Sequence, residues 1–317
     1  MSLPLISVVL ITYNGERHLK EQLDSILNQT YKNIEIIIAD DCSSDNTPSI
    51  LAEYQSKTNI TLKHNEKNLG FKENFAQACQ LAKGDLIAPA DQDDIWLPEK
   101  LETLQQAIDD HMLAYSNSRL MSEDGKPLDT DLGQHHHIRF VDGRCSRAFY
   151  LGNCIAAHTV LFRRETLQHF SPIPENLFHD QWLGFIAATI GSIKFIDQML
   201  VHYRQNPNSV TGKPDAPAHH SLRQRIQEKH ARQTKHINNK ISYLQRMLEL
   251  QIELGRKDEL LADLIQQYQA HDKHIFNWKL YRLLIKNGDQ LFATYQKEAK
   301  RLATKEATGS WLYKLAS

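Results

Sequence analysis

The chain has 317 residues, of which 41% are hydrophobic and 24% are charged. This length allows one large core plus a smaller unit, and the composition excludes collagen-like, low-complexity and disordered classes. The longest apolar runs, Ile6–Ile11 and Ile34–Ala39, are far shorter than the roughly 20 residues of a membrane-spanning helix. The first residues do not show the basic segment followed by a hydrophobic run that is typical of a secretion signal, so we expect none. We therefore expect a cytoplasmic protein, or one that sits peripherally on a membrane.

The net charge of −1 conceals an asymmetry between the two parts of the chain. Residues 1–215 carry 19 Lys and Arg against 28 Asp and Glu, a net charge of −9, whereas residues 216–317 carry 18 against 10, a net charge of +8. The four cysteines show none of the spacings of zinc or redox sites. We expect them to be reduced thiols.

The first 90 residues alternate apolar β-branched runs with segments of helical period, which indicates βαβ units and a mostly parallel sheet. The predicted strands are Leu5–Ile11, Ile34–Ala39, Ile60–Lys63 and Asp85–Pro89. Each crossover between them is predicted to be a helix.

The middle of the chain is less regular. Gly125–Pro127 predicts a turn, Gln134–His137 a polar loop, and the pair Asp142-Gly143 a hairpin. We expect this part to build a substrate surface. A helix near Trp182–Ile190 and two strand-like runs follow. The runs are Ser192–Ile196 and Met199–Tyr203.

Asn206–Pro217 is rich in Asn, Pro, Ser and Gly, and we place a domain boundary there. The predicted domains are residues 1–212, which bind a nucleotide-sugar and carry out catalysis, and residues 213–317, which form a helical unit for oligomerisation or membrane association. The apolar spacing from Leu222 to Leu248 marks one face of a long helix, and Gly255 is its predicted C-cap. The tail is expected to hold two to four helices.

Polar side chains directly follow three of the predicted strands, as Thr12–Glu16, Asp40–Asp45 and Asp91–Trp96. In doubly wound α/β folds the ligand binds outside the carboxyl ends of the strands. Any one of these segments fits a solvated loop or a helix N-cap, and capping is the better interpretation of Asp45. Three such segments at one edge indicate a ligand site.

Asp91, Asp93 and Asp94 form a cluster of carboxylates in the last of these segments. Two carboxylates about 4 Å apart repel by about 1 kcal/mol in water and by several times more in a cleft. Their oxygens are hard ligands that suit Mg²⁺ or Mn²⁺. Because the chain has no Gly-rich phosphate loop, we expect such a cation to hold the phosphates of a diphosphate substrate.

The order of these motifs resembles the family 2 glycosyltransferases of GT-A fold over about residues 5–212. The segments that carry the resemblance are Ser7–Asn14, Asp40–Asp45, Asn68–Gly70, Asp91–Lys100, His179–Trp182 and His202–Gln205. The form of the Asp91–Trp96 segment is most similar to the branch of rhamnosyltransferases and of capsule and O-antigen glycosyltransferases. The resemblance implies an α/β fold, with a Rossmann-like, mostly parallel mixed sheet followed by an α-helical C-terminal region.

The resemblance also implies a UDP- or dTDP-sugar as the donor. Tyr13 would stack on the base, while the backbone near Thr12 and the carboxylate of Asp41 would read the edge of the base. Asn14 and Glu16 are assigned to the same nucleotide site. An aromatic face with an acceptor for the N3–H group is also what a pyrimidine requires physically.

For the diphosphate, the resemblance implies that Asp93 ligates the metal and that Asp91 contacts the ribose or the metal. His202 is a further candidate ligand, although a structural histidine fits its position equally well. Arg204 is assigned to the diphosphate. Lys72 lies where the family approaches the nucleotide, although a solvated helix lysine is the alternative.

Asp180 matches the base that deprotonates the acceptor hydroxyl in this family, so that a single displacement inverts the anomeric centre. His179 stands where the family often has Glu, and a helix N-cap is the alternative role of Asp180. The acceptor would be a glycan or a lipid-linked glycan in surface polysaccharide synthesis, and His135–His137 would form a mobile loop beside it. We expect no nucleic acid partner, and a homodimer is one candidate assembly.

Two other functions remain open. Asp91-x-Asp93 after a strand also fits a phosphatase of the haloacid dehalogenase type, although Tyr13 and Asp41 would then be unexplained. The chain could also be a non-catalytic scaffold that binds a sugar-nucleotide. In the tail, Phe276–Ile285 fits a basic amphipathic helix on an anionic membrane and equally a helix packed inside the protein.

Overall fold

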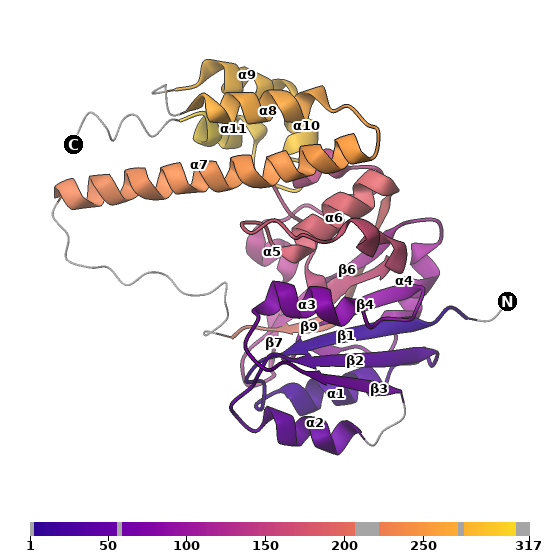
Figure 1. Ribbon diagram of the computed structural model, residues 1–317. Coiled ribbons are helices and arrows are strands. Elements are labelled where there is room, and N and C mark those ends of the chain that lie inside the picture. Colours follow the sequence, from indigo (N-terminus) through magenta and orange to yellow (C-terminus); the bar gives the residue numbers. More distant parts are fainter. Residues whose placement is uncertain (1–2, 56–58, 207–221, 272–275, 309–317) are drawn as a thin grey trace.

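The computed structural model describes residues 3–55, 59–206, 222–271 and 276–308. At its centre lies a nine-stranded sheet in the order β3-β2-β1-β4-β8-β6-β9-β5, with β7 paired to β6 (Figure 1). The strands are β1 (Ile6–Thr12), β2 (Ile34–Asp40), β3 (Ile60–His64), β4 (Leu86–Ala90), β5 (Ile95–Trp96), β6 (Leu113–Met121), β7 (Pro127–Asp131), β8 (Val160–Arg163) and β9 (Ile193–Arg204).

The first half of the sheet is parallel, and β1 pairs with both β2 and β4. The crossovers are α1 (Leu19–Leu27), α2 (Thr47–Gln55) and α3 (Phe71–Cys79), and α4 (Lys100–Ile108) follows β5. The four strands predicted in this half and the helices between them are confirmed to within a residue or two at each end of a strand.

Helices cover both faces of the sheet, and neighbouring residues of β1 point to opposite faces. Val8 belongs to the core under α1, α2 and α4, whereas its neighbour Val9 belongs to the core under α3 and α6 (His179–Ile190). Both faces of β1 are therefore buried, which explains its continuous apolar run.

The second half of the sheet differs from the prediction. The runs Ser192–Ile196 and Met199–Tyr203 are one strand, β9, which pairs with β6 through a register shift. The predicted hairpin at Asp142-Gly143 is wrong, because Gly143 forms an isolated bridge with Ile193 instead.

The polar stretch Gln134–His137 is predicted to be a loop, and for its first three residues this prediction is wrong. They close the short helix α5 (Leu132–His136), which begins at an Asp131 cap. Short 3₁₀ helices connect the remaining elements: η1 (Ser146–Phe149), η2 (Ala157–Thr159) and η3 (Arg164–His169).

Five helices of the tail lie in the described part of the chain, more than the two to four expected. They are α7 (Leu222–Glu253), α8 (Glu259–Gln269), α9 (Trp278–Lys286), α10 (Gly288–Leu291) and α11 (Ala299–Ala307). Gly255 has a φ of +69° and ends α7 as predicted. Most of the proposed boundary segment lies outside the described residues.

The helical tail shares one hydrophobic core with the sheet region. Leu244 and Met247 of α7 belong to the same buried cluster as Phe149 and Trp182, and α7 runs across the top of α6 (Figure 1). None of the helices in the described ranges combines the length and apolar character needed to cross a bilayer.

Candidate active site

The carboxyl ends of β1, β2 and β4 meet at one edge of the sheet, as the sequence predicted. In the parallel ladders Thr12 pairs with Asp40 and Leu10 pairs with Ala90. The segments that follow these strands, which begin at Tyr13, Asp41 and Asp91, therefore lie side by side.

Gln92 links two of these segments, and sequence reasoning did not assign it a role. Its Oε1 accepts hydrogen bonds from Thr12 Oγ1 at 2.7 Å and from the Tyr13 N–H at 2.8 Å. A Cβ atom on Gly15 would lie 2.6 Å from this same oxygen, so a larger residue there would displace the Gln92 side chain. The phenol of Tyr13 is 47% exposed and remains available to a ligand.

Asn14 and Glu16 bond the neighbouring loop rather than point into open space. Asn14 Oδ1 accepts from the Ser44 N–H at 2.9 Å, and Glu16 Oε2 accepts from the Asn46 N–H at 2.8 Å. These contacts fix the β1 loop against the β2 loop. Direct contact of either side chain with a nucleotide stays a prediction that this arrangement does not favour.

Asp41 is buried and holds the Asn68–Gly70 segment. Its Oδ1 accepts from the Leu69 N–H at 2.8 Å, and its Oδ2 accepts from the Gly70 N–H at 2.9 Å. Gly70 has a φ of +81°, a conformation that favours glycine. Asp41 therefore shapes this side of the site, and its contact with the base stays a prediction.

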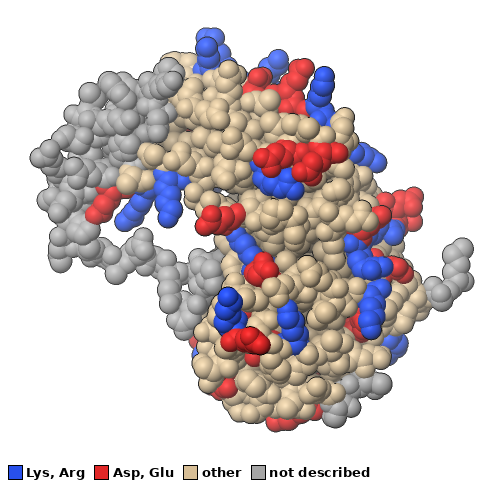
Figure 2. Space-filling model, in the orientation of Figure 1, with Lys and Arg blue, Asp and Glu red and all other residues tan. Residues whose placement is uncertain are grey.

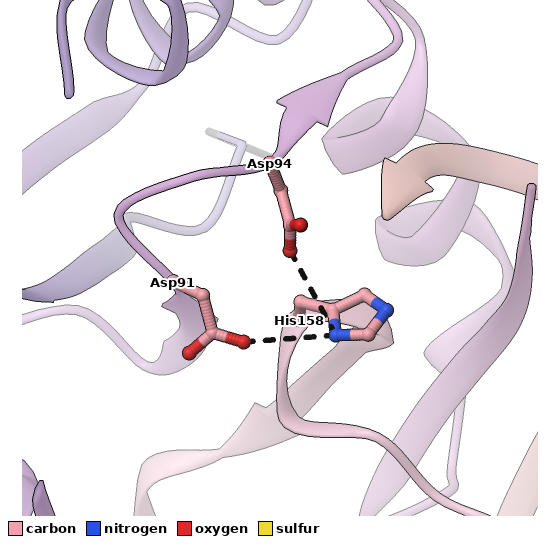
Figure 3. A group of neighbouring side chains, drawn as sticks. All are labelled: Asp91, Asp94 and His158. Atoms are coloured by element: carbon pink, nitrogen blue, oxygen red, sulfur yellow. Dashed lines mark ion pairs between the residues drawn. The ribbon is translucent and has the colours of Figure 1, made fainter. Parts of the chain in front are cut away.

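Two carboxylates of the acidic loop after β4 face a histidine. His158 Nδ1 lies 3.6 Å from Asp91 Oδ2 and 3.8 Å from Asp94 Oδ2 (Figure 3). Its Nε2 shares a hydrogen bond with Ser118 Oγ at 3.1 Å. Nδ1 therefore faces two carboxylates at distances too long for good hydrogen bonds.

A cation fits this group. Asp94 is fully buried, and no described residue forms a hydrogen bond with its Oδ2. Asp91, Asp94 and His158 each offer one ligand atom, and these atoms all lie within 4.8 Å of one another. Two carboxylates and an imidazole are a donor set that suits Mn²⁺, and the carboxylates alone suit Mg²⁺.

The carboxylates of the cluster repel one another. Burial and the charge of Asp91 raise the pKa of Asp93 to about 6. Burial and the same charge raise the pKa of Asp94 well above its ordinary value. Burial lowers the pKa of the neighbouring Lys100, whose Nζ lies over the Trp96 ring. A bound cation would relieve the repulsion among the carboxylates.

His158 takes the place that the sequence gave to His202. In β9, the Tyr203 ring stacks on His158 with a centroid separation of 4.4 Å, so the neighbouring side chain of His202 points to the opposite face of the sheet. His202 is therefore not favoured as a metal ligand.

The position of His158 follows from the pairing of β8 with β4. Sequence reasoning did not predict β8, and so it did not find this histidine. Leu86 pairs with Arg163 and Ile87 with Phe162 in an antiparallel ladder. Continued along the strands, this register places Asp91 opposite His158.

Arg204 is buried and supports the acidic loop. Its Nε donates to the Asp93 carbonyl at 2.8 Å, its Nη1 to the Glu123 carbonyl at 2.7 Å and its Nη2 to Glu21 Oε2 at 2.6 Å. Its backbone N–H donates to Asp94 Oδ1 at 3.1 Å. The predicted contact with a diphosphate is not favoured, because the guanidinium group is already held by the protein.

Asp180 lies in the first turn of α6 and faces the same site. Burial raises its pKa to about 7, and the charge of Asp91 acts in the same direction. Its Oδ1 accepts from the Gln181 N–H at 2.6 Å and from Asn153 Nδ2 at 3.2 Å. After burial, the charges of Asp91, Asp94, Asp93 and Asp180 all raise the pKa of Tyr203, so its phenol lies within electrostatic range of all four carboxylates.

The neighbouring His179 is a weaker base. Burial lowers its pKa to about 4, and its ring packs on Phe71 and Phe75 at centroid distances of 5.6 and 5.0 Å. Near neutral pH, Asp180 is the better proton acceptor of the two.

A cleft of about 640 Å³ lies between α3 and residues 171–173. Phe71 lines it and contacts His179, so the cleft reaches the neighbourhood of Asp180. Lys72 also lines it, and its Nζ donates to the carbonyls of Pro174 and Glu175. Lys72 therefore tethers the segment before α6 and is not simply a solvated helix lysine, while its contact with the nucleotide stays a prediction.

Comparison with known proteins agrees with this geometry. The model of the family described as glycosyl transferase family 2 matches residues 7–170. EpsH of Bacillus subtilis is 31% identical over 226 residues, which cover 66% of this chain and 63% of EpsH. TuaG of the same organism, whose name assigns it to teichuronic acid biosynthesis, is 35% identical over 129 residues, covering 40% of this chain and 51% of TuaG. The chain thus matches less than two thirds of the length of these relatives.

Among solved structures, residues 1–349 of TarS from S. aureus in complex with UDP-GlcNAc superimpose with a TM-score of 0.54 at 17% sequence identity. The match covers 95% of this chain and 90% of that one. At this identity the likeness shows the fold alone. The predicted GT-A type α/β fold with a helical C-terminal region is confirmed.

Proposed function

Because the chain belongs to glycosyl transferase family 2, we propose that it moves a sugar from a UDP- or dTDP-sugar to a hydroxyl group of a glycan or lipid-linked acceptor, with inversion. The observation that carries the proposal is a carboxylate with a pKa of about 7, Asp180, at the same edge of the sheet as the acidic loop. The name of TuaG supports a role in bacterial surface polysaccharide synthesis. The assignment to a rhamnosyltransferase branch stays a prediction.

In the proposed mechanism, Tyr13 stacks on the base while Gln92 fixes the Thr12–Tyr13 backbone beside it. A Mn²⁺ or Mg²⁺ ion would be held by Asp91, His158 and a carboxylate of Asp93 or Asp94, and would supply positive charge to the departing diphosphate. Asp180 accepts the proton of the acceptor hydroxyl as that oxygen attacks the anomeric carbon. The cleft beside Phe71 is the proposed approach for the acceptor.

The other two functions are less favoured. A phosphatase of the haloacid dehalogenase type is inconsistent with the family assignment. A non-catalytic scaffold would not need a carboxylate whose pKa is about 7. Loss of glycosyl transfer in an Asp180 variant would distinguish an enzyme from a scaffold. We keep the division into residues 1–212 and 213–317 as a proposal.

The donor class is tested by thermal stabilisation of the full chain. We expect UDP or dTDP, with Mn²⁺ present, to raise the melting temperature more than GDP does, because the site offers an aromatic face and the Asp41 carboxylate to a pyrimidine. Tyr13→Ala should reduce this shift, and Tyr281→Ala in the tail is the control. Stronger stabilisation by GDP would contradict the pyrimidine assignment.

The α9 face supports a proposal of membrane contact. Trp278 is 64% exposed and lies with Phe276 and Tyr281 in an aromatic cluster, with ring centroids 4.7 to 5.8 Å apart. Lys279 and Arg282 are exposed beside it. Lys and Arg side chains project from the tail at the top of Figure 2, beside acidic ones. The opposite side of α9, with Leu280 and Leu284, is packed inside the protein. Packing, one of the two alternatives for this segment, therefore describes that side, and membrane contact is proposed for the exposed side only.

We expect the full chain to co-sediment with anionic vesicles and to be released as salt is raised, because aromatic insertion and basic side chains act together. Trp278→Ser combined with Arg282→Glu should abolish the association. Ile252→Ser, at a side chain that is 63% exposed elsewhere, is the control. Equal sedimentation of all three proteins would show that the α9 face does not bind lipid.

A further inference from the structure

The carboxylate of Asp180 is oriented by an amide that is itself fixed. Asn153 Nδ2 donates to Asp180 Oδ1 at 3.2 Å and to the Ile155 carbonyl at 2.8 Å. Asn153 Oδ1 accepts from the Ile155 N–H at 3.0 Å. Because the Ile155 backbone engages both ends of the amide, the orientation of the side chain is fixed and one N–H of its NH₂ group is directed at Asp180.

The segment that carries Asn153 is held by the helical tail. Tyr295, which follows α10, donates its hydroxyl to the Leu151 carbonyl at 2.5 Å. A Cβ atom on Gly152 would lie 2.2 Å from Thr294 Oγ1 and 2.7 Å from the Tyr295 ring. The backbone next to Asn153 is therefore in direct contact with the tail.

Further contacts fix the residues just before this segment. Tyr243 of α7 donates its hydroxyl to the Tyr150 carbonyl at 3.1 Å. The Tyr150 hydroxyl in turn donates to Asp258 Oδ2 at 2.8 Å, and Arg147 Nε donates to the same oxygen at 3.2 Å. The tail thus anchors the chain from Arg147 to Gly152.

We infer that Asn153 is a positioning residue for the carboxylate of Asp180, and that the helical tail takes part in the transfer reaction by fixing the Leu151–Ile155 segment that carries this amide. The inference rests on the proposed role of Asp180 as the base. It assigns the tail a part in the chemistry that is independent of any membrane contact.

The amide also contributes to the ionisation of Asp180. Its hydrogen bond lowers the pKa of the carboxyl, against the larger effect of burial and the charge of Asp91. Titratable groups near the carboxyl in the described part of the chain include the adjacent His179, whose pKa burial lowers to about 4, the Cys154 thiol and the Tyr203 phenol. Loss of the amide should therefore move the pH at which Asp180 ionises upward.

The test is transfer kinetics of the full chain over a range of pH. We expect Asn153→Ala to lower kcat by about ten-fold, since a hydrogen bond to a charged group is lost. Nucleotide affinity should be unchanged, and the midpoint of the pH–rate profile should move to higher pH. Tyr295→Phe, which removes only the hydroxyl bonded to Leu151, should lower kcat in the same direction by a smaller factor. Tyr268→Phe, which removes a tail hydroxyl bonded to Glu306 Oε2 at 2.6 Å and not to the Leu151–Ile155 segment, is the matched control.

Combining the two substitutions gives the sharpest result. Because Tyr295 acts through the segment that carries Asn153, Tyr295→Phe should cause little further loss of kcat in the Asn153→Ala background. Full additivity would overturn the link between the tail and the amide. If Asn153→Ala keeps the parental kcat and the parental midpoint of the pH–rate profile, the positioning role is overturned. It is also overturned if kcat and the melting temperature both fall while the midpoint of the pH–rate profile does not move.

A wrong assignment of Asp180 as the base would give a different pattern of results. If Asp180→Asn retains transfer, the proposed function is wrong at that residue. If Asp180→Asn is inactive while Asn153→Ala and Tyr295→Phe behave as the parent, only the present inference fails. Should Asn153→Ala not fold, the comparison of Tyr295→Phe with Tyr268→Phe tests the inference.

Discussion

Asp180→Asn should bind nucleotide and metal about as tightly as the parent while losing glycosyl transfer by about 10²–10⁴-fold. The variant is nearly isosteric and keeps an oxygen that accepts from Asn153, but it cannot take up a proton near neutral pH. Isothermal titration with UDP or dTDP in the presence of Mn²⁺ measures binding, and release of nucleoside diphosphate from a donor sugar in the presence of an acceptor measures transfer.

The pH profile of the parent belongs to the same prediction. Burial raises the pKa of Asp180 to about 7, and a base acts in its deprotonated form. The transfer rate should therefore rise with pH through about 7, and cation binding nearby moves that midpoint to lower pH. Loss of nucleotide affinity together with activity in Asp180→Asn would make Asp180 a donor ligand instead. Retained activity would make His179 the next residue to test.

Asp91→Ala should abolish the dependence of nucleotide binding on a divalent cation. In the parent, UDP or dTDP should stabilise the protein with Mn²⁺ or Mg²⁺ and much less with EDTA, because no Gly-rich loop cradles the phosphates and the cation carries that charge. His158→Ala should strongly reduce the extra stabilisation by UDP or dTDP that the cation provides (the metal effect), since His158 Nδ1 faces Asp91 and Asp94.

Two control variants sharpen this comparison. His202→Ala should leave the metal effect near parental, because that side chain points to the other face of the sheet. Asp289→Ala removes an exposed carboxylate of α10 and should have no effect. Equal stabilisation of the parent with EDTA would contradict the metal site, and a larger effect of His202→Ala than of His158→Ala would restore the ligand predicted from sequence.

Local patterns in the sequence predicted the first half of the fold because each pattern there depends on nearby residues. Continuous apolar runs such as Ile34–Ala39 form buried parallel strands, and the segments after them meet at one edge through the ladder geometry. The positions of Tyr13, Asp41 and Asp91 followed from this rule alone.

The remaining features depend on contacts between distant residues, which periodicity does not encode. His158 reaches Asp91 only through the antiparallel pairing of β8 with β4, and β8 has four residues. Arg204 lies between Glu21 and Glu123, each far away in sequence. The contact of Gly152 with Thr294 likewise joins segments that no local signal connects.

The anomeric configuration of the product tests the central claim most directly, because a hydroxyl activated by Asp180 and attacking the donor in a single displacement must invert it. The measurement is ¹H NMR of the sugar transferred from a nucleotide-sugar of known configuration. Our account predicts a β-linked product from an α-linked donor. A product that retains the configuration of the donor would contradict the single-displacement mechanism, whatever the Asp180 variant shows.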